Sequence, residues 1–242
     1  GTDGTGTLSS ADGNTGVGTG VFGALTTGDN NVAVGFNSLD LNTTGSSNTS
    51  IGKDSLKSNT TGVGNTSVGM GTLYSNTTAS YNTAIGSLAL DTNPTGASNT
   101  AVGYDALTAN SSGTENTAVG SASLDANTTG DYNVAVGANS LSANTTADNN
   151  TAIGVAALRD NITGCRNVAV GRSALAVNTT GIENIAIGRN TLDANTTGSN
   201  NTAIGNSSLT TNTTGASNVA VGKDALAANT TGARNTGIGQ NA

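Results

Sequence analysis

The sequence predicts an all-β protein, a parallel β-solenoid built from coils of 17 residues. Three observations lead to this prediction. Asn recurs every 17 residues from Asn14 to Asn235, the repeat has no insertion or deletion, and its apolar residues keep fixed places within the unit. A constant period of this kind is the signature of an architecture in which each repeat stacks on the next.

The repeat comprises thirteen full units, from Asn14 to Arg234, and a partial fourteenth that begins at Asn235. We number the places of the unit 1 to 17 from this Asn. Place 1 is always Asn, place 2 is Thr, Val or Ile, place 3 is Ala, Ser or Gly, place 4 is Val or Ile, and place 5 is Gly. This alternating stretch, rich in β-branched residues, predicts a short strand that ends at the Gly.

The rest of the unit predicts a second strand and a turn. Place 9 is Leu in every full unit except the first, which has Phe22, and places 12 to 15 read Asn-Thr-Thr-Gly with few departures. We expect a second short strand over places 8 to 11 and a turn over places 12 to 15, where Asn and Gly are typical. A helical period of 3.6 residues does not persist across the units.

The bulky apolar residues of places 4 and 9 are expected to point into the coil. Asn at places 1 and 12 is expected to form ladders, because its amide can donate to and accept from the same residue one coil away. An isolated coil cannot bury enough apolar surface to fold, so the coils must stabilise one another. The predicted core and ladder residues are Val34, Leu39, Asn42, Ile85, Leu90, Asn116, Val136, Leu141, Ile187 and Leu192.

Place 3 suggests a contact with another chain. If place 4 points inward, alternation along the strand turns place 3 outward. An outward place in contact with water should accept charged residues, yet place 3 holds only Ala, Ser or Gly. We therefore predict that a second copy of the chain packs against it, and that the protein is a homo-oligomer. The predicted interface residues are Ala84, Ala101, Ala118, Ala135, Ala152 and Ala169.

The domain organisation follows from the extent of the repeat. Residues 14–242 are predicted to form the solenoid. Residues 1–13 keep Gly and Thr but lose the apolar places, which predicts an N-terminal cap or a junction with an upstream domain.

Composition argues against several functions. The net charge is −7 and the eight Lys and Arg residues are dispersed, so the chain lacks the basic cluster that a nucleic acid requires. No stretch approaches the ~20 apolar residues of a membrane span. There is no His, and the single Cys165 lacks a partner for a disulfide or an activating base. We therefore expect no enzyme activity, no metal and no cofactor.

Carboxylates at place 10, such as Asp40 and Asp91, could in principle bind cations. The same place also holds Lys57, Tyr74 and Arg159, which favours a solvated face over a metal site.

The strings "NTAIG", "NVAVG" and "NTSVG" resemble the Asn-Ser-Val-Ala-Ile-Gly motif of YadA-like head domains in trimeric autotransporter adhesins. The longer phrase, with Ala-Leu and Asn-Thr-Thr-Gly, is similar to repeats of phage tail-fibre-type proteins. The resemblance covers residues 14 to 242 and implies a left-handed parallel β-roll in which three chains pack side by side. The unit is longer than the usual adhesin head repeat, and Thr often replaces the first apolar residue of the motif.

These features together predict a non-enzymatic, structural and adhesive protein: an extracellular, trimeric β-roll that forms the shaft or head of a surface fibre. Places 6, 7, 10, 16 and 17 vary most, so they are expected to face outward and to carry any receptor surface. A host-surface or matrix receptor would meet the exposed aromatic residues there. These are Phe36, Tyr74, Tyr81, Tyr104 and Tyr132.

Three alternatives remain open at this point. The chain could be the shaft of a phage tail fibre, or a self-assembling extracellular filament. It could also be an ice-binding solenoid, because Thr fills place 14 in twelve of the thirteen full units. Against ice binding, Thr at places 13 and 14 should point to opposite sides, and place 14 could turn inward to satisfy its hydroxyl.

Overall fold

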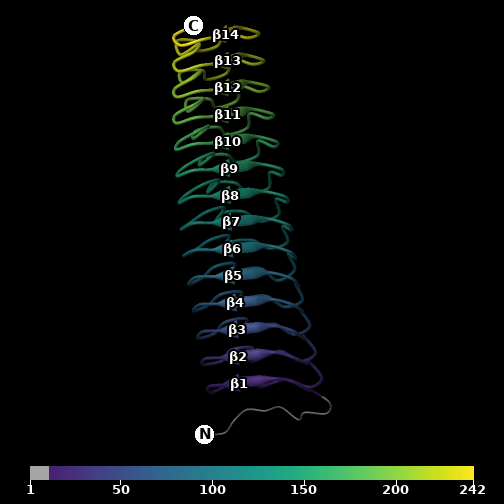
Figure 1. Ribbon diagram of the computed structural model, residues 1–242. Helices are drawn as coiled ribbons and strands as arrows, with labels where there is room; N and C mark the ends of the chain where they lie inside the picture. Colours follow the sequence, from purple (N-terminus) through teal and green to yellow (C-terminus); the bar gives the residue numbers. More distant parts are fainter. Residues whose placement is uncertain (1–10) are drawn as a thin grey trace. The chain divides into compact units, whose positions relative to one another are not determined.

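The structure, a computed structural model, describes residues 11–242. The chain forms two compact units, of which the first ends at Asn116 and the second runs from Thr117 to Ala242. Each unit is a β-solenoid with one short strand per coil (Figure 1). The predicted β-solenoid is therefore confirmed. Most of the predicted cap or junction over residues 1–13 lies outside the described residues.

The strands contain three residues each, at places 2 to 4. In the first unit they are β1 (Thr15–Val17), β2 (Val32–Val34), β3 (Thr49–Ile51), β4 (Thr66–Val68), β5 (Thr83–Ile85) and β6 (Thr100–Val102). In the second unit they are β7 (Thr117–Val119), β8 (Val134–Val136), β9 (Thr151–Ile153), β10 (Val168–Val170), β11 (Ile185–Ile187), β12 (Thr202–Ile204), β13 (Val219–Val221) and β14 (Thr236–Ile238).

Within each unit, every strand pairs in parallel with the strand of the next coil. Equivalent places lie opposite each other, as for Ala169 and Ala186 in β10 and β11. A slip of one residue would turn the buried side chains outward, which explains why the period never changes.

The second strand predicted over places 8 to 11 is wrong. This segment forms turns in which places 7 and 9 adopt left-handed backbone conformations, as in Asn190 (φ 53°) and Leu192 (φ 51°). Two consecutive side chains, Thr191 and Leu192, consequently point into the coil. A left-handed residue other than Gly costs about 1–2 kcal/mol. Burial of a Leu side chain, worth about 1.5–3 kcal/mol, offsets that cost.

The predicted directions of places 3 and 4 are also reversed. From β2 to β14, place 3 is buried inside a single chain, while places 2 and 4 face outward. The predicted core positions that are in fact partly or well exposed are Val34, Ile85, Val136 and Ile187. The predicted interface residues are 0% exposed in the chain's own interior, namely Ala84, Ala101, Ala118, Ala135, Ala152 and Ala169.

The other predicted core and ladder residues are confirmed as buried: Leu39, Asn42, Leu90, Asn116, Leu141 and Leu192. Each coil interior is narrow, because the Leu of place 9 and the two Asn places already fill most of it. The first coil shows how little space remains for a side chain at place 3. A Cβ added to Gly16, at place 3, would lie 2.8 Å from Cγ1 of Val21 and 3.1 Å from the ring of Phe22. Only small residues therefore fit at place 3.

The Asn ladders form as predicted. At place 1, Asn184 donates its backbone N–H to Oδ1 of Asn167 (3.0 Å), and its Nδ2 donates to the Gly198 carbonyl (2.9 Å). At place 12, Nδ2 of Asn178 donates to Oδ1 of Asn161 (2.8 Å) and to the Gly181 carbonyl (3.0 Å).

The Asn of each Asn-Thr-Thr string is thus occupied. Asn42, Asn59 and Asn178 are 0% exposed, so their amides cannot accept a glycan in the folded chain. The Asn-Thr-Thr strings match the glycosylation sequon Asn-x-Ser/Thr, but the fold makes these Asn residues inaccessible.

A chain of buried hydroxyls runs through part of the first unit. Oγ of Ser38 lies 2.8 Å from that of Ser50, which lies 2.9 Å from that of Ser55, and the series continues through Ser67 to Thr72. All five are buried. These residues alternate between places 3 and 8 of neighbouring coils, so the polar groups satisfy one another inside the solenoid.

Candidate interaction surfaces

The outward sheet face is the most regular surface of both units. It is formed by place 2, which is Thr, Val or Ile, and place 4, which is Val or Ile in all fourteen coils. These side chains project away from the buried Ala row between them. Ile85 is 41% exposed and Ile187 is 39% exposed. Apolar surface of this kind, exposed in every coil, is typical of surfaces that bind another molecule.

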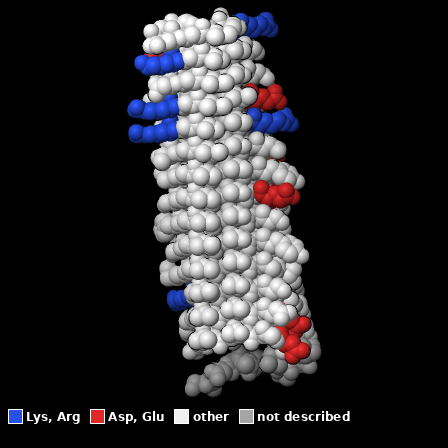
Figure 2. All heavy atoms as spheres, in the orientation of Figure 1, with Lys and Arg blue, Asp and Glu red and all other residues white. Residues whose placement is uncertain are grey.

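This face carries no charge, since no Lys, Arg, Asp or Glu occurs at place 2 or 4. Figure 2 shows one side of the molecule, where uncharged side chains form columns that repeat from coil to coil and charged side chains lie toward the edges. The two units differ in their charge. The first has two cations and eight acidic residues, and the second has six cations and seven acidic residues.

The five aromatic residues predicted as a contact surface are all exposed, with exposed fractions between 38% for Tyr74 and 66% for Tyr81. They do not form one cluster. Phe36 and Tyr104 occupy place 6, Tyr74 place 10, and Tyr81 and Tyr132 place 17.

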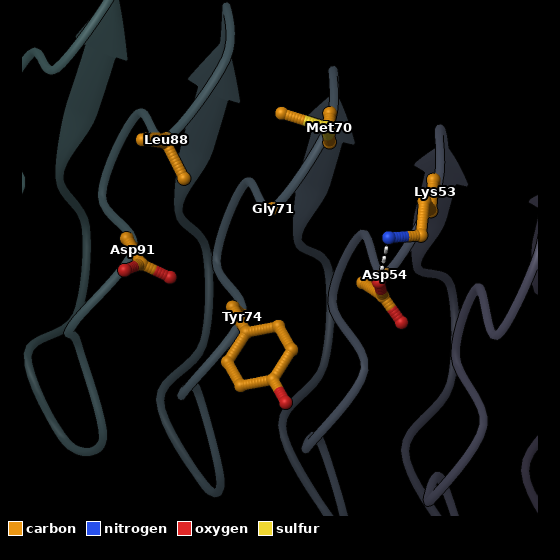
Figure 3. Close-up of a pocket in the computed structure, with 7 residues that line it drawn as sticks. All are labelled: Lys53, Asp54, Met70, Gly71, Tyr74, Leu88 and Asp91. Atoms are coloured by element: carbon orange, nitrogen blue, oxygen red, sulfur yellow. Dashed lines mark ion pairs between the residues drawn. The ribbon is translucent and has the colours of Figure 1, made fainter.

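A shallow pocket of about 320 Å³ lies beside Tyr74 in the first unit. Its lining comes from three successive coils, those that begin with β3, β4 and β5 (Figure 3). The hollow arises where place 7 is Gly71, because that residue has no side chain between those of Asp54 and Leu88. The seven lining residues are Lys53, Asp54, Met70, Gly71, Tyr74, Leu88 and Asp91.

At one end of the pocket, the negative charge of Asp54 is balanced by two lysines. Asp54 lies 3.2 Å from Nζ of Lys53 and 3.4 Å from Nζ of Lys57, and it accepts a hydrogen bond of 3.1 Å from Asn37. Burial alone would raise the pKa of Asp54, but these hydrogen bonds and charges together hold it below its ordinary value. Nζ of Lys57 also lies 5.6 Å from the centre of the Tyr74 ring, in cation–π range.

The opposite end holds Asp91, which forms no ion pair among residues 11–242. Burial raises its pKa, and the negative charge of Asp105 in the next coil adds to the shift. Tyr104 is hydrogen-bonded to Asp105, which raises the pKa of the phenol. Figure 3 shows the Tyr74 ring between Asp54 and Asp91.

The raised pKa of Asp91 leads to a stability prediction. The folded state binds this proton more tightly than the unfolded state, so stability falls as the pH rises from the ordinary pKa through the raised one. Asp91→Asn should therefore stabilise the chain at pH 7 by about 0.5 kcal/mol, and the gain should disappear below pH ~3. Urea unfolding at the two pH values measures the difference.

Asp40→Asn is the matched control, because Asp40 occupies place 10 three coils earlier. The charge of Asp40 attracts Lys57, so removing it should not stabilise the chain. An equal gain in both variants would contradict the assigned cause.

Sequence reasoning missed the pocket, because its residues occupy variable places of three different coils. One signal was available: Leu88 is the only bulky apolar residue at place 7, which otherwise holds small or polar residues.

The remaining candidate residues, Cys165 and the acidic side chains, form no metal-binding cluster within residues 11–242. The partly buried Cys165 has a free thiol 3.6 Å from the Thr163 carbonyl. Over residues 11–242, no three His, Cys, Asp or Glu side chains gather in a way that could hold a metal ion. Nor does this part of the chain contain a helix long and apolar enough to cross a membrane.

Comparisons with protein-family models, with curated proteins and with solved structures found no match to this chain.

Proposed function

We propose that the chain is a non-enzymatic structural and adhesive protein that assembles side by side, as a homotrimer, into the shaft or head of an extracellular fibre. One observation carries the proposal: in every coil, places 2 and 4 present uncharged and largely apolar side chains to the outside. The motif's resemblance to trimeric adhesin heads supports the trimer and the extracellular location. A phage tail-fibre shaft would use the same assembly.

The regularity of the face explains why another copy of the chain suits it. Neighbouring strands in a sheet lie about 4.8 Å apart, so two copies at the same height present rows of equal spacing. Within each unit, ridges of Val and Ile on one copy can then pack against those of the next, coil by coil. Burial of this surface would supply apolar contact that the narrow interior of a single coil lacks.

The double variant Ile153→Lys/Ile187→Lys tests the contact. Each substitution places an ammonium on the outward face at place 4, where a subunit contact would desolvate it without a partner. We expect the mass measured by light scattering to fall from that of three chains to that of one. Thr146→Lys/Thr180→Lys is the matched control, since both Thr residues are exposed at place 14. An oligomer that survives the Ile substitutions unchanged would refute this interface.

Ice binding is the second candidate function. The sheet face is better suited to bind ice than the surface formed by the Asn-Thr-Thr-Gly turns. Thr occupies place 2 in nine of the fourteen coils, on the same face as the Val and Ile of place 4. At the turns, the side chains of place 14 are exposed and do not point inward. The hydroxyls of place 13 are already hydrogen-bonded, as in Thr60, whose hydroxyl donates to the Thr77 carbonyl. Thermal hysteresis in a monomeric sample would support ice binding over the fibre.

A further inference from the structure

Place 6 of the first unit carries an alternating row. From β2 to β6 the residues are Phe36, Lys53, Met70, Ser87 and Tyr104, so a large apolar side chain occurs in every second coil. Phe36 is 50% exposed, Met70 53% and Tyr104 57%.

The backbone holds this row in line. The N–H of place 7 donates to the place 6 carbonyl of the preceding coil throughout, with distances of 2.8 to 3.2 Å for the pairs Asp54–Phe36, Gly71–Lys53, Leu88–Met70 and Asp105–Ser87. Place 6 residues therefore stack in register. With about 4.8 Å between coils, the three large side chains follow one another at about 9.6 Å.

The shallow pocket opens beside the middle of the row. Met70 belongs to both, and Tyr74 and Leu88 add further apolar surface. Asp91 supplies carboxylate oxygens that form no ion pair within residues 11–242. The other carboxylate, Asp54, is already engaged by Lys53 and Lys57. The site thus combines apolar platforms with a hydrogen-bond acceptor and carries no large excess of charge.

We propose that this row and pocket bind a linear, uncharged polysaccharide that lies along the coil stack. The inference names the ligand of the adhesive surface and so rests on the function proposed above. The C–H face of a sugar ring packs on aromatic and thioether side chains, and two extended β-linked rings have a length close to two coil spacings. Ring hydroxyls would donate to Asp91 inside the pocket.

The spacing disfavours an extended peptide. Side chains on one face of a strand recur at about 6.7 Å, twice the rise per residue, and this period does not match the row. A polyanion is disfavoured as well, because the first unit has eight acidic residues and only two cations.

Isothermal titration of the full chain with β-1,4-linked hexasaccharides of glucose and of N-acetylglucosamine tests the proposal. We expect at least one to bind, and the matching trisaccharide, which cannot span the row, to bind more weakly. Tyr104→Ala and Met70→Ala should each weaken binding about tenfold. Tyr81→Ala is the control, because Tyr81 is an exposed aromatic residue of the same unit (66%) but lies at place 17. Circular dichroism verifies that each variant is folded.

The inference would be overturned if neither hexasaccharide bound, or if Tyr81→Ala weakened binding as much as Tyr104→Ala. Binding of a tri-lysine peptide in place of both sugars, lost in Asp91→Asn, would also overturn it in favour of a basic peptide ligand. A trimer that binds no sugar contradicts this inference alone, whereas a monomer that binds sugar contradicts only the fibre assembly.

Discussion

Gly188→Ala is expected to destabilise the second unit by about 4 kcal/mol or more, the largest effect of any single substitution considered. Gly188 directly follows β11 and has a φ of +136°, a conformation that other residues rarely adopt. An added Cβ would lie 2.5 Å from the carbonyl oxygen and 2.7 Å from the carbonyl carbon of Gly205 in the next coil. Both contacts are with backbone, which cannot move without breaking the stack. Urea unfolding followed by circular dichroism measures the loss.

Gly239→Ala distinguishes the backbone strain of an Ala at this φ from the steric clash of its Cβ with the next coil. Gly239 has the same place and a similar φ of +123°, but a Cβ there would meet nothing within 4 Å. Gly239→Ala should therefore lower the free energy of unfolding only by the backbone strain, about 1–3 kcal/mol. Equal losses in the two variants would contradict the close approach of successive coils as the reason for Gly at place 5.

Asn184→Ala is expected to cost about 3 kcal/mol or more, because it leaves several buried groups without partners. Oδ1 of Asn184 accepts the backbone N–H (3.0 Å) and Nδ2 (3.1 Å) of Asn201, and its Nδ2 donates to the Gly198 carbonyl (2.9 Å). All of these lie inside the solenoid, where water cannot replace the lost amide. Urea unfolding of the full chain again provides the measurement.

Asn206→Ala is the control for this prediction, because Asn206 is exposed at place 6 of the following coil. It should change stability by no more than about 0.5 kcal/mol. A similarly small effect at Asn184 would mean that the Asn ladder contributes little to stability.

The period and the ladders could be predicted from the sequence because they depend on identity between coils. Equivalent residues stack, so a place that never varies reports a constraint common to all coils. Asn at places 1 and 12 and Leu at place 9 are of this kind, and the structure buries them as expected.

The direction of the strand side chains could not be read in the same way. Alternation leaves two solutions, and the bulkier place was predicted to be the inner one. Whether an interior accepts Ile187 or Ala186 depends on the space left by Leu192 and the Asn ladders, which only the turn geometry determines. Left-handed conformations at places 7 and 9 turn two consecutive side chains inward and fill that space.

The pocket lay beyond sequence reasoning for a different reason. Met70, Tyr74, Leu88 and Asp91 share no place-specific pattern, and they meet only because three coils stack. Residues at variable places form a site only together with residues of neighbouring coils. Which residues meet in this way can be worked out once the register is known.

Sedimentation equilibrium of the unaltered chain over a range of concentrations would show whether another copy covers the outward face of places 2 and 4. We expect a mass of three chains of 23.3 kDa each. A single mass of 23.3 kDa at all concentrations would contradict it and leave the sheet face free for another surface, such as ice.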